Sequence, residues 1–113
     1  MIDQVRPRDL DAWLGAVRDL GQPVVLDVRE PAELRRASVP TNGFELIEMP
    51  IGEVTRRLPE LDPERPVACL CHHGIRSMQV AAFLSAQGFA RVANIAGGIS
   101  AWSAELDPGV PTY

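Results

Sequence analysis

The sequence predicts an α/β fold in which a central, mostly parallel sheet carries helices on both faces. Short apolar segments of strand length alternate along the chain with segments whose apolar residues recur at helical spacing. Such alternation is typical of parallel strands joined by helical crossovers. At 113 residues the chain has the size of one domain. We therefore expect residues 1–113 to form a single three-layer domain.

Each element is placed by its own apolar pattern. The first helix has an apolar stripe that runs from Leu10 through Trp13 and Leu14 to Val17. The first strand is the β-branched, mainly apolar run 23–28, which is typical of a buried strand. The expected elements in chain order are helix 9–20, strand 23–28, helix 30–35, loop 40–44, strand 46–49, helix 51–61, strand 66–70, helix 77–87, strand 91–95 and helix 98–106.

The composition is that of an acidic globular protein. Apolar residues make up 46% of the chain and the formal net charge is −4, which does not favour nucleic acid or an anionic membrane as a partner. No apolar run approaches the roughly 20 residues of a membrane span, and the N-terminal segment lacks the apolar region of a signal peptide. Two cysteines are too few for a disulfide framework. We expect a cytoplasmic protein that is a monomer or a weak dimer.

The most informative segment follows the strand 66–70, where residues 71–76 read CHHGIR. Ligands of parallel sheets bind beyond the carboxyl ends of the strands. A thiolate at Cys71 would there be stabilised by loop N–H groups and by the N-terminus of the next helix. Gly74 permits an unusual loop conformation, and Arg76 adds a fixed positive charge. These residue types predict a nucleophilic cysteine that acts on an anion.

Cys71 is thus the predicted catalytic residue, and the residues that follow it are the predicted substrate-binding set. Arg76 is expected to orient an anion rather than only to pair with a carboxylate. Nothing in the spacing of the two histidines demands proton transfer, so they are expected to shape the loop. The substrate-binding set consists of His72, His73, Gly74, Ile75, Arg76 and Ser77.

No metal and no cofactor are expected. Cys69 shares a strand face with Cys71 but belongs to the apolar run, so we expect it to be a buried bystander. Cys69, Cys71, His72 and His73 lack the second distant pair of ligands that is typical of zinc sites.

Three motifs together resemble the rhodanese family. Residues 26–31 (LDVREP) are similar to its first signature, residues 71–77 (CHHGIRS) to its catalytic loop, and residues 97–102 (GGISAW) to its C-terminal signature. Many family members carry GHIPGA where residues 37–43 read ASVPTNG, so this loop departs from the pattern. The resemblance implies a parallel α/β domain and a structural ion pair between Asp27 and Arg29.

The resemblance also implies an activity, that of a single-domain sulfurtransferase. Cys71 would take a sulfane sulfur from a small anionic donor such as thiosulfate, become a persulfide, and pass the sulfur to a thiophilic acceptor. That acceptor would be cyanide in an assay and a thiol or protein in the cell. The loop with paired histidines resembles rhodanese modules joined to adenylating enzymes that load sulfur-carrier proteins, so the resemblance also allows a protein donor or acceptor.

The sequence also allows three other functions. Cysteine phosphatases and arsenate reductases hold an oxyanion in a loop one residue longer than the four residues, 72–75, between Cys71 and Arg76. A rhodanese-like binding module without activity commonly lacks the cysteine, which this chain keeps. A redox role through a disulfide between Cys69 and Cys71 would strain the strand geometry.

Overall fold

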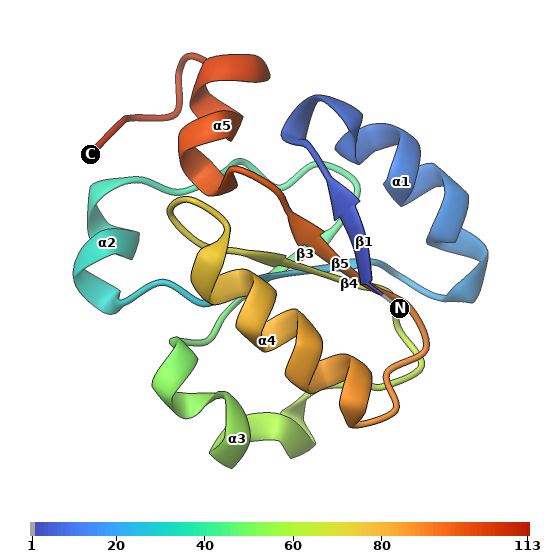
Figure 1. Ribbon diagram of the computed structural model, residues 1–113. Helices are drawn as coiled ribbons and strands as arrows, with labels where there is room; N and C mark the ends of the chain where they lie inside the picture. Colours follow the sequence, from blue (N-terminus) through green and yellow to red (C-terminus); the bar gives the residue numbers. More distant parts are fainter. Residues whose placement is uncertain (1) are drawn as a thin grey trace.

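A single parallel sheet organises residues 2–113, which the computed structural model describes (Figure 1). The strands lie in the order β1-β5-β4-β2-β3, and every neighbouring pair is parallel. The sheet is therefore entirely parallel within the described residues, and the predicted α/β architecture is confirmed. The strands are β1 (Ile2–Val5), β2 (Val24–Asp27), β3 (Glu45–Glu48), β4 (Val67–Leu70) and β5 (Val92–Ile95).

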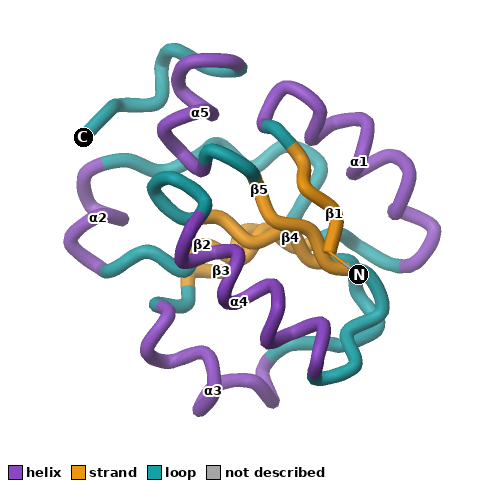
Figure 2. The backbone as a smooth tube through the Cα atoms, viewed as in Figure 1, coloured by secondary structure: helices purple, strands orange, loops and turns teal. Residues whose placement is uncertain are grey.

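Helices cover both faces of this sheet, with α1 and α5 on one face and α3 and α4 on the other (Figures 1 and 2). The α-helices are α1 (Leu10–Val17), α2 (Pro31–Arg36), α3 (Val54–Arg57), α4 (Ile75–Ala86) and α5 (Gly98–Glu105). Short 3₁₀ turns flank α1 and α3, which explains why the predicted helices 9–20 and 51–61 are longer than the α-helices observed. Pro59 lacks the N–H that a continued α-helix would need, so α3 gives way to a 3₁₀ turn.

Two apolar clusters pack on opposite faces of the sheet. Alternate residues of β2 enter different clusters, with Val25 on the face of α1 and α5 and Leu26 on the face of α4. Leu14 and Trp102 belong to the first cluster, and Leu84 belongs to the second. Because both faces are covered, β2, β4 and β5 are buried along their whole length, as their apolar sequences predict.

The sequence pattern was wrong in two places that affect the site. It missed β1, whose short sequence IDQV carries polar residues in its middle and pairs at the sheet edge with β5. It also placed the start of the helix after the cysteine loop at Ser77, whereas α4 begins at Ile75. Ile75 and Arg76 therefore lie in the first helical turn. Within residues 2–113, no helix is long and apolar enough to cross a membrane.

Candidate active site

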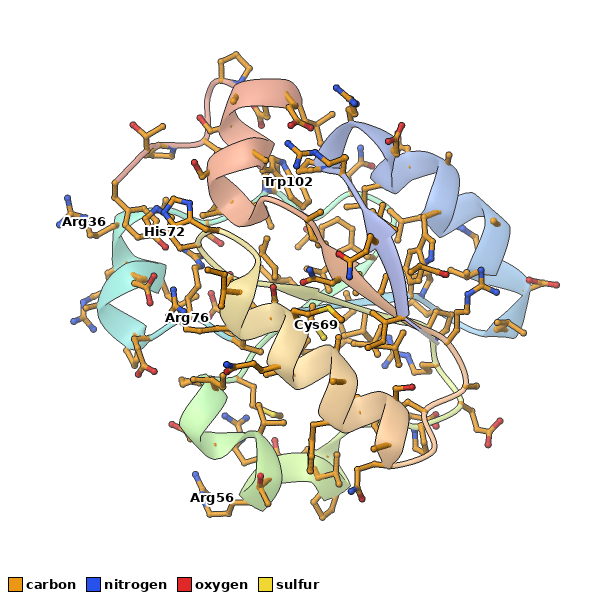
Figure 3. The ribbon with its side chains drawn as sticks, in the orientation of Figure 1. Arg36, Arg56, Cys69, His72, Arg76 and Trp102 are labelled. Atoms are coloured by element: carbon orange, nitrogen blue, oxygen red, sulfur yellow. The ribbon has the colours of Figure 1, made fainter. Side chains whose placement is uncertain are left out.

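The Cys71 loop lies at the carboxyl edge of the sheet, between the end of β4 and the start of α4. β4 is the middle strand of the sheet, so the loop is surrounded by elements from both halves of the chain. Figure 3 shows His72 and Arg76 on the side of the loop that faces α2, whereas Cys69 lies between the sheet and α4. Cys71 thus follows the carboxyl end of a strand, as its place in the sequence predicts.

The sulfur of Cys71 is enclosed by hydrogen-bonding groups of the loop and of α4. The backbone N–H groups of Gly74 and Ser77 donate to Sγ at 3.1 Å and 3.3 Å. The Ser77 hydroxyl lies 3.2 Å from Sγ and accepts the thiol hydrogen. Gly74 makes this loop possible, because its φ of 100° is a left-handed conformation that favours glycine.

The two cysteines differ sharply in acidity. Burial raises the pKa of the Cys71 thiol, but the hydrogen bonds that the Ser77 hydroxyl and the N–H groups of Ser77 and Gly74 donate to the thiolate outweigh burial and bring the pKa below its ordinary value. Burial raises the pKa of Cys69 to about 12, since this thiol lies entirely within the apolar cluster under α4. Cys69 is therefore buried, as predicted, and Cys71 is the more acidic of the two thiols.

The N-terminus of α5 packs against the cysteine loop and donates hydrogen bonds to its backbone. The backbone N–H of Ile99 donates to the Cys71 carbonyl at 2.9 Å, and that of Ser100 donates to the His72 carbonyl at 3.1 Å. A Cβ atom at Gly98 would lie 2.4 Å from both of these carbonyl oxygens. Only glycine allows α5 to approach so closely, which gives residues 97–102 a direct structural link to the cysteine loop.

Arg76 pairs with a carboxylate, which was the alternative to anion binding in the sequence analysis, but its partner was not predicted. Its Nη1 and Nη2 atoms donate to the two carboxylate oxygens of Glu33 in α2 at 2.6 Å and 2.8 Å. The Arg76 guanidinium holds the pKa of Glu33 down to about 2. The Arg76 side chain is still 32% exposed, so its charge borders the solvent at the loop.

Arg29 and Asp27 form the buried pair that the resemblance implies. Both side chains are fully buried, and Nη2 of Arg29 lies 2.7 Å from Oδ2 of Asp27. Arg29 also donates to the carbonyl of Ala37 at 2.8 Å and to the hydroxyl of Tyr113 at 3.1 Å. Arg29 thereby ties the end of β2 to α2 and to the C-terminal residue.

Three aromatic rings stack beside the loop. The centroid of His72 lies 3.9 Å from that of His73 and 4.0 Å from that of Tyr113. Burial and the neighbouring His73 lower the pKa of His72 below its ordinary value, so this imidazole is neutral near pH 7. The Tyr113 hydroxyl also donates to Glu33 at 2.8 Å, which links the stack to the ion pair of Arg76.

The predicted substrate-binding residues lie at different depths. Ile75 is 72% exposed at the outer edge of the loop, and His73 is also exposed. Ser77 is fully buried and faces the sulfur from inside the protein. Sequence reasoning missed Glu33, Tyr113 and Asn94; of these, Asn94 had a signal, because it is a polar residue within an apolar strand. Among residues 2–113, no three metal-ligating side chains converge.

The fold and the site together define an α/β protein with a buried, hydrogen-bonded cysteine of lowered pKa at the carboxyl edge of a parallel sheet. The rhodanese-like domain family matches residues 10–105, and the chain belongs to this family.

Known relatives agree with this assignment. A sulfurtransferase of Allochromatium vinosum is 31% identical over 103 residues, which cover 91% of this chain and 90% of the relative. The chloroplastic rhodanese-like/PpiC domain-containing protein 12 of Arabidopsis thaliana is 45% identical over 93 residues, which cover 79% of this chain but only 30% of the relative. A crystal structure of a rhodanese-related protein from Thermoplasma volcanium superimposes with a TM-score of 0.77 at 31% identity and covers 98% of this chain and 99% of that one. These similarities support a sulfurtransferase at the level of the family.

Proposed function

We propose that the protein transfers a sulfane sulfur from a small anionic donor, such as thiosulfate, to a thiophilic acceptor through a persulfide on Cys71. The observation that carries this proposal is the enclosure of Sγ by the N–H groups of Gly74 and Ser77 at 3.1 Å and 3.3 Å. These groups favour a thiolate, which is the nucleophilic form of cysteine.

The proposed reaction consists of two displacements at sulfur. The Cys71 thiolate attacks the outer sulfur of thiosulfate, a new S–S bond forms, and the donor S–S bond breaks so that its electron pair leaves with sulfite. A nucleophilic acceptor then attacks the outer sulfur of the persulfide, and Cys71 departs again as a thiolate. The two steps balance without a metal or an organic cofactor, and loop N–H groups stabilise the charge that develops on sulfur.

The charged rim of the loop suits an anionic donor. Arg76 is one-third exposed and supplies a fixed positive charge, although Glu33 neutralises part of it. His72, His73 and Ile75 lie within four residues of Cys71, are partly or largely exposed, and are proposed to contact the donor or the acceptor. We propose a protein as an alternative donor or acceptor, because Ile75 presents an apolar side chain to solvent that a partner would cover.

The free thiols of both cysteines suggest a reducing cell compartment. Both cysteines are free, and one of them is poised for reaction. A free reactive thiol is best maintained in a reducing compartment, so we propose that the domain formed by residues 1–113 acts in the cytoplasm.

Formation of thiocyanate from thiosulfate and cyanide tests the function. We expect the wild-type protein to turn over and Cys71→Ser to be inactive, because serine is a far weaker nucleophile for sulfur. Cys69→Ala is the matched control and should keep most of the activity, since the Cys69 thiol is buried with a pKa of about 12. Turnover of an aryl phosphate without any sulfur transfer would instead favour a phosphatase.

A further inference from the structure

The Ser77 hydroxyl lies between two groups that can each accept its hydrogen, the Cys71 thiolate and the Asn94 side-chain oxygen. Its oxygen is 3.2 Å from Sγ of Cys71 and 2.6 Å from Oδ1 of Asn94 on β5. Ser77 is fully buried and Asn94 is 4% exposed, so solvent does not substitute for either partner. A hydroxyl group carries a single hydrogen and can donate it to only one of the two.

The orientation of the Asn94 amide decides which partner receives this hydrogen. Nδ2 of Asn94 faces the carbonyl oxygen of Gly74 at 3.3 Å and Oε1 of Gln4 at 3.0 Å. A backbone carbonyl can only accept, so the amide must present its N–H₂ group to Gly74 and its oxygen to Ser77. Ser77 accordingly donates to Asn94 and accepts from the thiol of Cys71.

We propose that Asn94 is a positioning residue that favours the thiol form of Cys71 by competing with the thiolate for the hydroxyl hydrogen of Ser77. In the thiol form, S–H donates to the hydroxyl and the hydroxyl donates to Asn94. When the thiol proton is lost to solvent, the Ser77 hydroxyl turns toward the sulfur and Oδ1 of Asn94 loses its donor. The cost of that lost hydrogen bond opposes formation of the thiolate, in addition to the effects of burial and of the backbone N–H groups.

The same turn of the hydroxyl would accompany sulfur transfer, and this part of the inference rests on the proposed function. In the persulfide, Sγ carries no charge, so the Ser77 hydroxyl returns to Asn94. When the acceptor removes the outer sulfur, Cys71 leaves as a thiolate and draws the hydroxyl back. The other hydrogen bonds to Sγ come from backbone N–H groups, which always donate. The Ser77 hydroxyl is the contact whose direction changes, and Asn94 controls that change.

Other charged or titratable groups surround the loop and are common to every variant compared below. They come from the strand before the cysteine, from the loop, from the two neighbouring helices and from the C-terminal residue. These groups are Cys69 on β4, His72 and His73 in the loop, Arg76 on α4, Glu33 on α2, and Tyr113. Differences in the alkylation midpoint between the variants therefore show which group receives the Ser77 hydroxyl hydrogen.

The test is the pH dependence of Cys71 alkylation by iodoacetamide, with the modified residue identified by fragment-ion mass spectrometry. Asn94→Ala removes the competitor, so we expect the midpoint to fall by about one pH unit, which makes alkylation up to about tenfold faster below the wild-type midpoint. Ser77→Ala removes a donor to the thiolate and should raise the midpoint. Gln4→Ala leaves the hydrogen bond between Ser77 and Asn94 in place and should behave as wild type.

The double variant separates this effect from a general disturbance of the loop. Without the Ser77 hydroxyl, adding Asn94→Ala should change nothing further, so Ser77→Ala and the double variant should share one midpoint. Asn94→Leu, which has a similar size and no acceptor, should shift the midpoint downward like Asn94→Ala and provides the test should the smaller variant not fold. A rise of the midpoint in Asn94→Ala, or a shift that persists in the Ser77→Ala background, would overturn the proposal.

Alkylation needs no sulfur donor, so the outcome is independent of sulfur transfer. If Cys71 transfers sulfur but Asn94→Ala and Asn94→Leu leave the midpoint unchanged, only the role of Asn94 is wrong. If the midpoint shifts as expected but no sulfur is ever transferred, the hydrogen competition stands and the proposed function is wrong.

Discussion

Arg76 and Glu33 face each other as a two-pronged ion pair that joins the first turn of α4 to α2, with N–O distances of 2.6 Å and 2.8 Å. The pair bears on the proposed function because Arg76 follows Cys71, the proposed nucleophile, by five positions and borders the loop. Its guanidinium is thus held in place by the same carboxylate that cancels part of its charge.

Glu33→Gln should make Arg76 more available to an anionic donor. The amide keeps the size of the side chain but removes its charge, so we expect KM for thiosulfate to fall on the order of fivefold, equivalent to about 1 kcal/mol. Arg76→Ala should raise KM instead. Glu64→Gln, an exposed substitution with the same change in net charge, is the control for steady-state kinetics. Equal KM values in Glu33→Gln and the wild type would show that Arg76 acts only in the structure.

Acid should weaken the contribution of this ion pair to stability. Arg76 lowers the pKa of Glu33 from 4.5 to about 2 in the folded protein. A lowered carboxyl pKa stabilises the fold fully above the unfolded value of 4.5 and ceases to do so as the pH falls through about 2.

Urea unfolding of the wild type and Glu33→Gln at several pH values measures this linkage. The wild type should be more stable by about 1 to 2 kcal/mol near neutral pH, since partial exposure of Arg76 screens the pair. The difference should shrink steadily below the ordinary pKa of a glutamate. A difference that is constant down to the lowest pH would refute the assignment.

Loss of Arg29 should be among the most damaging changes to stability. Arg29→Met leaves the fully buried Asp27 carboxylate without its partner, so we expect a loss of about 3–5 kcal/mol in urea unfolding. Arg8→Met, at an exposed arginine, should change the stability by less than about 0.5 kcal/mol. A loss at Arg29 no greater than at Arg8 would mean that the buried pair does not hold the end of β2.

Gly98→Ala should disturb the backbone of the cysteine loop, against which Gly98 packs. The new Cβ would lie 2.4 Å from the carbonyl oxygens of Cys71 and His72, and the φ of +60° already disfavours a side chain. We expect a destabilisation of about 1–3 kcal/mol together with slower alkylation of Cys71. Gly15→Ala on α1 is the control, because its Cβ would meet no described atom within 4 Å. If Gly98→Ala is destabilised but its Cys71 is alkylated at the wild-type rate, Gly98 supports the fold and not the conformation of the cysteine loop.

Local patterns predicted the parts of the fold and site that depend on neighbouring residues. β4 is a continuous apolar run and β2 and β5 are mainly apolar, and the position of Cys71 at a strand end follows from the run before it. β1 escaped prediction because an edge strand of four residues with a polar centre has no distinctive period. Its place is set by pairing with β5, about 90 residues later in the chain.

The contacts that tune the site are also long-range and could not be predicted from spacing. Glu33 meets Arg76 across 43 positions of sequence, and Tyr113 reaches Glu33 across 80. Only Asn94 was open to inference, since a polar residue in a buried strand requires a hydrogen-bond partner.

The intact mass of the protein after incubation with thiosulfate, and again after cyanide, tests the central claim most directly. We predict a gain of one sulfur atom that cyanide removes, that Cys69→Ala retains and that Cys71→Ser abolishes. No gain in a folded protein, with thiosulfate and with a low-molecular-weight persulfide alike, would contradict a persulfide mechanism at Cys71.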